Sequence, residues 1–327
     1  MRKNRNIRKS TGIYMRIVFM GTSPFAVPSL EALVSAGHDI ATVVTQPDRP
    51  GGRGRSMRMS PVKQLALTLG LPVFQPERIR EQDAIDHIKN YEPLDAIVVA
   101  AFGQIIPQAI LNMPKYGSIN VHASLLPKYR GAAPIQYAIM RGEAKTGVTT
   151  MLMDAGLDTG DILLMSETEI GMDETAGELE PRLANIGAEL LILTLDKLER
   201  GEITPQPQDP SRATVAKSLK RDEGRIDWNR PAKDIQNLVR AFTPRPGTFT
   251  ILNNAQIKIH KAEAIGEISE GKAPGEVVDI TKDEIIVAAG EGGVKLIEIQ
   301  PENRQKMSAG AFARGSRLNL GTLFTSS

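Results

Sequence analysis

The sequence contains no cysteine, few aromatic residues and no long apolar run. Phe, Trp and Tyr together make up 4% of the 327 residues. Without cysteine the chain has no disulfides, no zinc-thiolate sites and no thiol nucleophile, which agrees with a reducing compartment. No apolar segment reaches the roughly 18 residues that a membrane-spanning helix needs. We therefore expect a soluble, cytoplasmic protein that does not interact with membranes.

The net charge is small, but the basic residues are unevenly distributed. The whole chain carries a net charge of +2, whereas residues 1–14 alone contain five basic side chains. No apolar stretch of the kind found in secretory signals follows them. We expect residues 1–14 to be a disordered basic tail and the fold to begin at Met15.

The first half of the chain alternates β-branched runs with helical patterns. Such alternation predicts a Rossmann-like, mostly parallel sheet with helices on both faces, an α/β fold. Helical spacing covers residues 29–36, and a second helix is expected after Ser60-Pro61, where serine can cap and proline fits the first turn. Strands are expected at residues 16–20, 40–45, 96–101 and 118–121.

A long helical pattern over residues 175–198 closes this half of the chain. Pro181 lies inside it and predicts a kink or a later helix start, because proline removes a backbone donor. Prolines between 205 and 210 then indicate a linker. From about Gly247, short alternating runs predict a small C-terminal β-barrel of the OB type. The expected domains are a catalytic domain over 15–204, and a linker with the barrel over 205–327.

One segment joins an apolar strand to a polar loop, Asn120-Val121-His122-Ala123-Ser124-Leu125-Leu126-Pro127. Asn120 and His122 are two residues apart, so on a strand their side chains share a face, which at the strand's C-terminal end can border a ligand crevice. The alternative is an asparagine in a turn and a histidine with only structural hydrogen bonds. A second segment, residues 147–162, runs from a strand into a glycine-rich acidic turn that lacks the ligand spacing of a calcium loop. We expect no metal site.

At these residues the sequence resembles the folate-dependent formyltransferases. The family's Asn-x-His-x-Ser-Leu-Leu-Pro segment and its later Leu-Asp-x-Gly loop both occur here, in that order. The likeness is greatest to the members that act on tRNA, and extends from about Met15 to Lys306. It rests on three further strings, at residues 45–50, 130–136 and 225–228. The loop at 21–26 lacks the glycine spacing of a dinucleotide dehydrogenase.

The resemblance implies the reaction and its partners. The formyl donor is 10-formyltetrahydrofolate, the acceptor is the methionine amine of initiator Met-tRNA, and the product serves translation initiation. No obligate protein partner is expected. The remaining alternatives are a formyltransferase that acts on a sugar-nucleotide or purine-precursor amine, a formylfolate hydrolase, and an RNA-binding module on an inactive enzyme fold.

The resemblance also implies the site residues. Asn120, His122 and Asp158 form the catalytic set: the amide and imidazole stabilise an oxyanion, and Asp158 orients the imidazole and helps to move a proton. Ser124 is not expected to act as a nucleophile, because the substrate amine attacks directly. The residues expected to bind the folate are Phe102, Gly103, Gln104, Ile105, Ser124, Leu125, Leu126, Pro127 and Leu157.

A basic, glycine-rich segment lies between residues 45 and 63. It holds five basic residues and one acidic residue, and such a mobile loop can follow a phosphate backbone, although most charge runs are solvated surface. In the tRNA-acting members a loop at this place enters the acceptor stem. Residues 205–327 add 18 basic and 15 acidic side chains, only a modest excess, so a role in RNA binding there comes from the resemblance. The expected tRNA-binding residues are Arg49, Arg53, Arg55 and Arg58.

Overall fold

The computed structural model describes residues 14–51 and 56–325, which form two compact units. The first unit contains the described residues up to Arg130, together with Gly147–Glu167 and Pro181–Thr214. The second contains Gly131–Thr146, Thr168–Glu180 and the chain from Val215 onward. The expected tail lies almost wholly outside the described residues, as do Arg53 and Arg55. The domain boundary expected at residue 204 stays a prediction.

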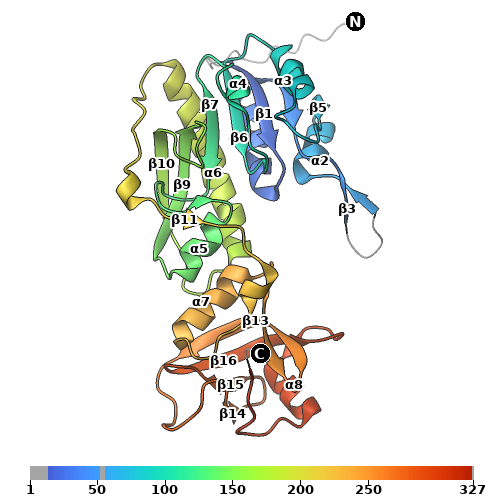
Figure 1. The fold of residues 1–327 in the computed structure, drawn as a ribbon, viewed down its shortest axis with the longest axis vertical. Helices are drawn as coiled ribbons and strands as arrows, with labels where there is room; N and C mark the ends of the chain where they lie inside the picture. The colour runs from blue at the N-terminus through green and yellow to red at the C-terminus, as the bar shows by residue number, and fades with distance from the viewer. Residues whose placement is uncertain (1–13, 52–55, 326–327) are drawn as a thin grey trace, which may run out of the picture. The chain divides into compact units, whose positions relative to one another are not determined.

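The first unit is built on a seven-stranded sheet with the order β10-β9-β7-β6-β1-β2-β5 (Figure 1). The strands from β7 to β5 run parallel, and β9 is antiparallel to β7. The predicted mostly parallel sheet is therefore confirmed, while β5 and the edge strand β10 were not among the expected strands. The strands are β1 (Arg16–Gly21), β2 (Asp39–Val44), β5 (Val73–Phe74), β6 (Ala96–Ala100), β7 (Ser118–His122), β9 (Lys145–Leu152) and β10 (Ile162–Glu169).

The helices α1 and α2 confirm the two helices expected early in the chain. Ser60 caps α2, because its hydroxyl accepts a hydrogen bond from the Lys63 amide at 3.0 Å. The other elements of this unit are η1 (Pro24–Ala26), α1 (Val27–Ser35), α2 (Pro61–Thr68), α3 (Gln82–Lys89), α4 (Gln108–Leu111) and the short paired strands β3 (Arg49–Gly51) and β4 (Ser56–Arg58). A further two-stranded sheet pairs β8 (Arg130–Gly131) with β11 (Val215–Ala216).

The long helix α6 (Ala176–Glu199) runs through Pro181 without a later start. Of the two alternatives expected at Pro181, a kink or a later start, the later start does not occur, because a strong cap lies upstream of the proline. Glu178 accepts hydrogen bonds from both the amide and the hydroxyl of Thr175, which fixes the first turn at that point. Pro181 then costs the helix a single backbone bond, the one it would have donated to the Gly177 carbonyl.

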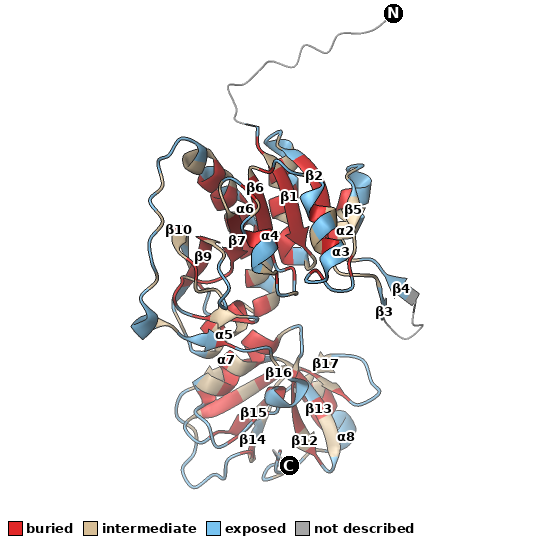
Figure 2. Cartoon of the chain, turned by 45° about the horizontal axis from the view of Figure 1, so that its top comes forward, coloured by how far each residue is buried: buried red, intermediate tan, exposed pale blue. Residues whose placement is uncertain are grey.

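Helices cover both faces of the sheet, as the sequence predicted. Alternate residues of β1 and β6, such as Met20 and Val99, pack with α3 and α4 in one buried cluster. On the opposite face α6 approaches closely at Gly187, where a Cβ would lie 2.8 Å from the Val121 side chain. Figure 2 shows these central strands buried. Because side chains alternate along a strand, Asn120 and His122 face away from α6, on the α3 and α4 side.

The second unit contains an antiparallel sheet with the order β12-β13-β16-β15-β14, and β17 pairs with β16. The short alternating runs from which the barrel was predicted, at residues 257–260, 277–280 and 285–287, fall within β13, β14 and β15. The elements are α5 (Pro134–Met140), η3 (Arg221–Gly224), α7 (Ala232–Phe242), β12 (Thr248–Leu252), β13 (Ala255–Ile265), β14 (Val277–Ile280), β15 (Ile285–Ala288), β16 (Gly293–Pro301), β17 (Met307–Ser308) and α8 (Ala309–Ser316).

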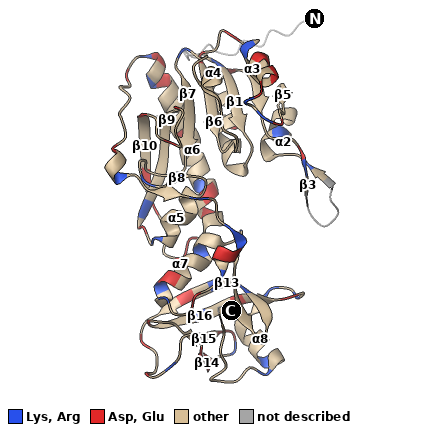
Figure 3. Cartoon of the chain, viewed as in Figure 1, with Lys and Arg blue, Asp and Glu red and all other residues tan. Residues whose placement is uncertain are grey.

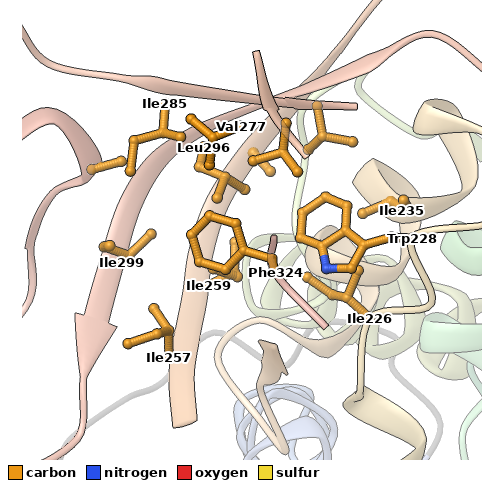
Figure 4. Close-up of a cluster of buried hydrophobic side chains, with 14 of the residues drawn as sticks. Ile226, Trp228, Ile235, Ile257, Ile259, Val277, Ile285, Leu296, Ile299 and Phe324 are labelled. Carbon is orange, nitrogen blue, oxygen red and sulfur yellow. The ribbon is translucent and has the colours of Figure 1, made fainter. Parts of the chain in front are cut away.

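The end of the chain joins the two edges of this sheet. Thr325 bridges Ile251 of β12, and Leu323 bridges Glu276, next to β14. The sheet therefore closes on itself, and the expected small C-terminal barrel is confirmed. Between these two bridges Phe324 points into the core, where its ring lies 6.0 Å from that of Trp228 (Figure 4).

We predict that Phe324→Ala destabilises the barrel by about 3–5 kcal/mol, the usual cost of removing a buried phenylalanine. Trp228 is the single tryptophan of the chain, so its fluorescence reports denaturant unfolding of this unit. The neighbouring Leu323 is largely exposed, and Leu323→Ala should change the free energy of unfolding by less than about 0.5 kcal/mol. Equal losses in both variants would contradict closure through the Phe324 side chain.

Candidate active site

Strand β7 brings two side chains of the predicted set to one carboxylate. Asn120 Nδ2 donates to Asp158 Oδ1 at 3.3 Å, and His122 Nδ1 lies 3.6 Å from Asp158 Oδ2. All three side chains are largely buried, with His122 6% and Asp158 13% exposed. The structure therefore places Asn120, His122 and Asp158 together, and the inference that the first two share a strand face is confirmed.

The orientation of the His122 ring follows from its second nitrogen. His122 Nε2 lies 3.0 Å from the carbonyl oxygen of Tyr129. A carbonyl can only accept, so Nε2 carries the proton and Nδ1 presents its lone pair towards Asp158 whenever the ring is neutral. The backbone of Tyr129 is in a left-handed conformation, with φ at +59°.

Asp158 lies on the turn after β9, also in a left-handed conformation with φ at +51°. A neighbouring carboxylate shapes this turn: Asp154 accepts hydrogen bonds from the Gly156 amide at 3.0 Å and the Thr159 hydroxyl at 2.7 Å. Two acidic residues of the predicted turn therefore have different structural roles. Asp154 organises the loop, and Asp158 turns inward to the two β7 side chains.

The loop after β6 is held by its Phe102 carbonyl. Thr22 Oγ1 and Gln46 Nε2 donate to this oxygen at 2.9 and 3.0 Å. Gly103 follows with φ at +82°, and Ile105 is 84% exposed. The loop lies at the carboxyl ends of β1 and β6, where the strand order reverses, which is the usual ligand position in an open α/β sheet. Sequence reasoning assigned no role to Gln46, although it belongs to a string quoted for the resemblance.

The Ser-Leu-Leu-Pro segment is mostly buried. Ser124 is buried and its hydroxyl donates to the Lys128 carbonyl at 2.6 Å, which suits a loop-forming residue better than a nucleophile. Thr149 donates to the Ser124 carbonyl and accepts from the Leu126 amide, so strand β9 fixes this loop. Of the remaining residues expected to bind the donor, Gln104 and Leu125 are partly exposed, Pro127 is buried and Leu157 is 62% exposed.

The base of the expected mobile loop is a two-stranded hairpin. Arg49 of β3 pairs in register with Arg58 of β4, and the Arg49 guanidinium forms an ion pair with Glu77 at 2.6 Å. Asp48 anchors the hairpin through Lys63, at 2.6 Å. The hydrogen bonds from Lys63 and Gln75 lower the pKa of Asp48, so this carboxylate stays charged.

The other charged residues are mixed in sign. Figure 3 shows basic and acidic segments on the same helix, α7, of the second unit. Within residues 14–51 and 56–325, no three His, Asp or Glu side chains are placed to hold a metal ion. No helix in the same part of the chain has the length and apolar character needed to cross a bilayer.

Comparison with known families and relatives gives one consistent result. The family described as "Formyl transferase" matches residues 15–195, and "Formyl transferase, C-terminal domain" matches residues 218–317. A methionyl-tRNA formyltransferase of Solibacter usitatus is 51% identical over 304 residues, covering 93% of this chain and 96% of that protein. One from Lachnospira eligens is 47% identical, covering 94% and 99% of the two chains.

Solved structures resemble this chain in fold. HypX from Aquifex aeolicus in complex with tetrahydrofolic acid superposes with a TM-score of 0.64 at 17% identity, covering 94% of this chain and 48% of that one. WlaRD, a sugar 3N-formyl transferase, also gives a TM-score of 0.64, at 21% identity, with 90% and 100% of the chains covered. These likenesses support the two-part architecture.

We predict that Gly103→Ala destabilises the first unit more than Gly70→Ala does. Both glycines have positive φ, so either alanine pays about 1–2 kcal/mol of backbone strain. A Cβ at Gly103 would also collide with the Gln46 amide, whereas nothing lies within 4 Å of one at Gly70. Losing the Gln46 hydrogen bond to Phe102 should add about 1 kcal/mol. Denaturant unfolding followed by circular dichroism measures the difference, and equal losses would show that Gln46 does not restrain the loop.

Proposed function

The chain belongs to the formyl transferase family, and from this we propose that it transfers the formyl group of 10-formyltetrahydrofolate to the methionine amine of initiator Met-tRNA. The product, N-formylmethionyl-tRNA, serves translation initiation. One observation carries the choice of acceptor. Eight methionyl-tRNA formyltransferases are 45–51% identical to the chain over more than 90% of its length, which includes the hairpin and the barrel.

Asn120 is proposed to stabilise the oxyanion. Attack of the amine on the formyl carbon places negative charge on the formyl oxygen, and a fixed N–H donor aimed at that atom lowers the barrier. The Nδ2 group of Asn120 has two N–H bonds. Its hydrogen bond to Asp158 uses one and fixes the amide plane, so the second can donate to the oxyanion.

His122 is proposed to take the proton that the attacking nitrogen loses. Its Nε2 proton is committed to the Tyr129 carbonyl, which leaves the Nδ1 lone pair for this task. The Asp158 carboxylate lies beside Nδ1 and stabilises the imidazolium that forms. When the carbon–nitrogen bond to the folate breaks, N10 must gain a proton, and the imidazolium is the nearby acid. This sequence of two proton transfers favours His122 as general base and then general acid, rather than as a hydrogen-bond donor to the oxyanion.

The loop after β6 fits a folate. Phe102 turns inward with its carbonyl already satisfied, so the exposed backbone around Gly103 can meet a flat, polar-edged ring. Ile105 and Leu157 are large apolar side chains left exposed, as expected of residues that cover a bound aromatic ring. These features support the proposed donor contacts, while the inward-facing Ser124 and Leu126 contribute by shaping the loop.

The basic hairpin and the barrel are proposed to bind the tRNA. Arg49 and Arg58 lie opposite each other on the hairpin, and two like charges at one register position favour a bound phosphate between or beside them. Arg53 and Arg55 belong to the same proposal but lie outside the described residues. Cytoplasmic location follows from the same role, because translation supplies the acceptor.

An amine panel tests the acceptor. The protein is incubated with 10-formyltetrahydrofolate and, separately, charged initiator Met-tRNA, a dTDP-amino sugar, a purine-precursor amine and water. Formyl transfer to Met-tRNA alone is expected. Transfer to another amine would show that the chain is a formyltransferase with a different acceptor. Release of formate without an acceptor would identify a hydrolase.

We predict that Asn120→Ala, His122→Ala and Asp158→Ala each slow single-turnover formyl transfer about 100- to 1,000-fold. Their affinity for tRNA should stay nearly unchanged, because these groups act on the transition state. Asn112→Ala, an exposed asparagine of the same unit, serves as the control and should behave as wild type. Near wild-type rates in all three site variants would contradict the assignment of these residues as catalytic.

We predict that Arg49→Ala weakens Met-tRNA binding and lowers the slope of log K against log salt by about 0.7, the value for one lost single-strand phosphate contact. Glu77→Gln should act in the opposite direction, since it releases Arg49 from its ion pair. Arg200→Ala removes an arginine equally engaged with an aspartate on α6 and should leave the slope unchanged. Identical salt dependence in the Arg49 and Arg200 variants would show that the hairpin is a solvated surface segment that does not contact the tRNA phosphates.

A further inference from the structure

We propose that the linker after α6 is part of the catalytic apparatus, with Gln208 and Thr214 as positioning residues for Asp158 and His122. The inference rests on the proposed function, because it assigns these two residues to the same reaction. Sequence reasoning interpreted this proline-containing segment only as a connection between domains.

Gln208 fixes the backbone of the Asp158 turn. Its Nε2 donates to the carbonyl oxygens of Asp158 at 2.8 Å and Gly160 at 2.7 Å. Its Oε1 accepts from Nε and Nη2 of Arg130, at 3.0 and 2.7 Å. Arg130 thereby fixes the amide orientation, because a guanidinium can only donate and Oε1 must face it. The two N–H bonds of Gln208 are then aimed at the carbonyls of Asp158 and Gly160, the first of which belongs to the residue whose carboxylate lies against His122.

Thr214 fixes the support of His122. Its Oγ1 accepts from the Tyr129 amide at 2.8 Å, and its carbonyl accepts from the Arg130 amide at 2.8 Å. The Tyr129 carbonyl, in turn, holds His122 Nε2. Both hydrogen-bonded loop residues, Asp158 and Tyr129, have positive φ. Left-handed backbone is disfavoured for residues with a side chain, so external hydrogen bonds are needed to hold it.

The two contacts reach the catalytic pair from one segment. Gln208 and Thr214 are six residues apart on the same linker, and each acts on a different member of the His122 and Asp158 pair. A shift of about 1 Å between reacting groups can cost roughly 100-fold in rate. The distance between His122 Nδ1 and Asp158 Oδ2 therefore depends on the linker holding both loops.

The first experiment compares Gln208→Met with Gln206→Met. Gln206 lies in the same linker, but its side chain is exposed and donates to the neighbouring Thr204 carbonyl at 3.1 Å. Gln208→Met should lower kcat for formylation of Met-tRNA about 10- to 100-fold. The KM values for Met-tRNA and 10-formyltetrahydrofolate, and the melting temperature, should stay close to wild type. Gln206→Met should leave all four quantities unchanged.

The second experiment asks whether the hydroxyl of Thr214 is the active group. Thr214→Val keeps the shape and removes the acceptor, whereas Thr214→Ser keeps the acceptor and removes a methyl group. A fall of about 10-fold in kcat for the valine variant, restored in the serine variant, is expected. A merely structural role would lower the melting temperature of both and would not separate them by kcat.

Three results overturn the inference, each in a different way. Unchanged kcat in Gln208→Met and Thr214→Val, with wild type active on Met-tRNA, removes the positioning role and leaves the proposed function intact. A wild-type protein that does not formylate Met-tRNA removes the proposed function itself. Loss of kcat that is matched by raised KM values or by unfolding would assign the linker to binding or to stability instead.

Discussion

The proposed active site depends on the placement of one carboxylate against two side chains that already have fixed positions. Asn120 and His122 are set by strand β7, which is buried and paired on both sides. Asp158 comes from a turn where its backbone is left-handed, and its two carboxylate oxygens reach one strand residue each. A turn is more easily displaced than a central strand. The distances from Asp158 to Asn120 and His122 therefore depend on the hydrogen bonds that hold this turn in place.

The hydrogen bond to the Tyr129 carbonyl has a chemical consequence beyond orientation. It assigns the neutral tautomer of His122 and faces a basic nitrogen towards a carboxylate at a distance longer than a hydrogen bond. Such a pair gains attraction when the imidazole becomes protonated. In the proposed reaction, the arrangement therefore stabilises the state that follows proton removal more than the state that precedes it, which is the requirement for catalysis by differential binding.

The sheet and two of the proposed site residues could be predicted from the sequence, because their residues follow regular spacing along the chain. Asn120 and His122 obey the two-residue period of a strand, and the alternation of strands and helices indicated the sheet. The hydrogen bond from Gln208 to the Asp158 carbonyl could not be predicted, because a glutamine 50 residues from its partner has no local pattern. The start of α6 upstream of Pro181 could not be predicted for a related reason: the cap at Thr175 outweighs a single lost hydrogen bond. Barrel closure by residues 323–325 is equally long-range.

The hairpin combines two ion pairs of different character. Asp48 and Lys63 expose only 19% and 16% of their side chains and anchor its base, whereas Glu77 and Arg49 expose 65% and 62%. An exposed pair contributes at most about 1 kcal/mol, so a phosphate can displace Glu77 at little cost. Arg49 is thus held in an ordered position on a fixed base without being tightly bound. In the proposed tRNA contact, this lowers the entropy lost on binding while leaving the guanidinium available.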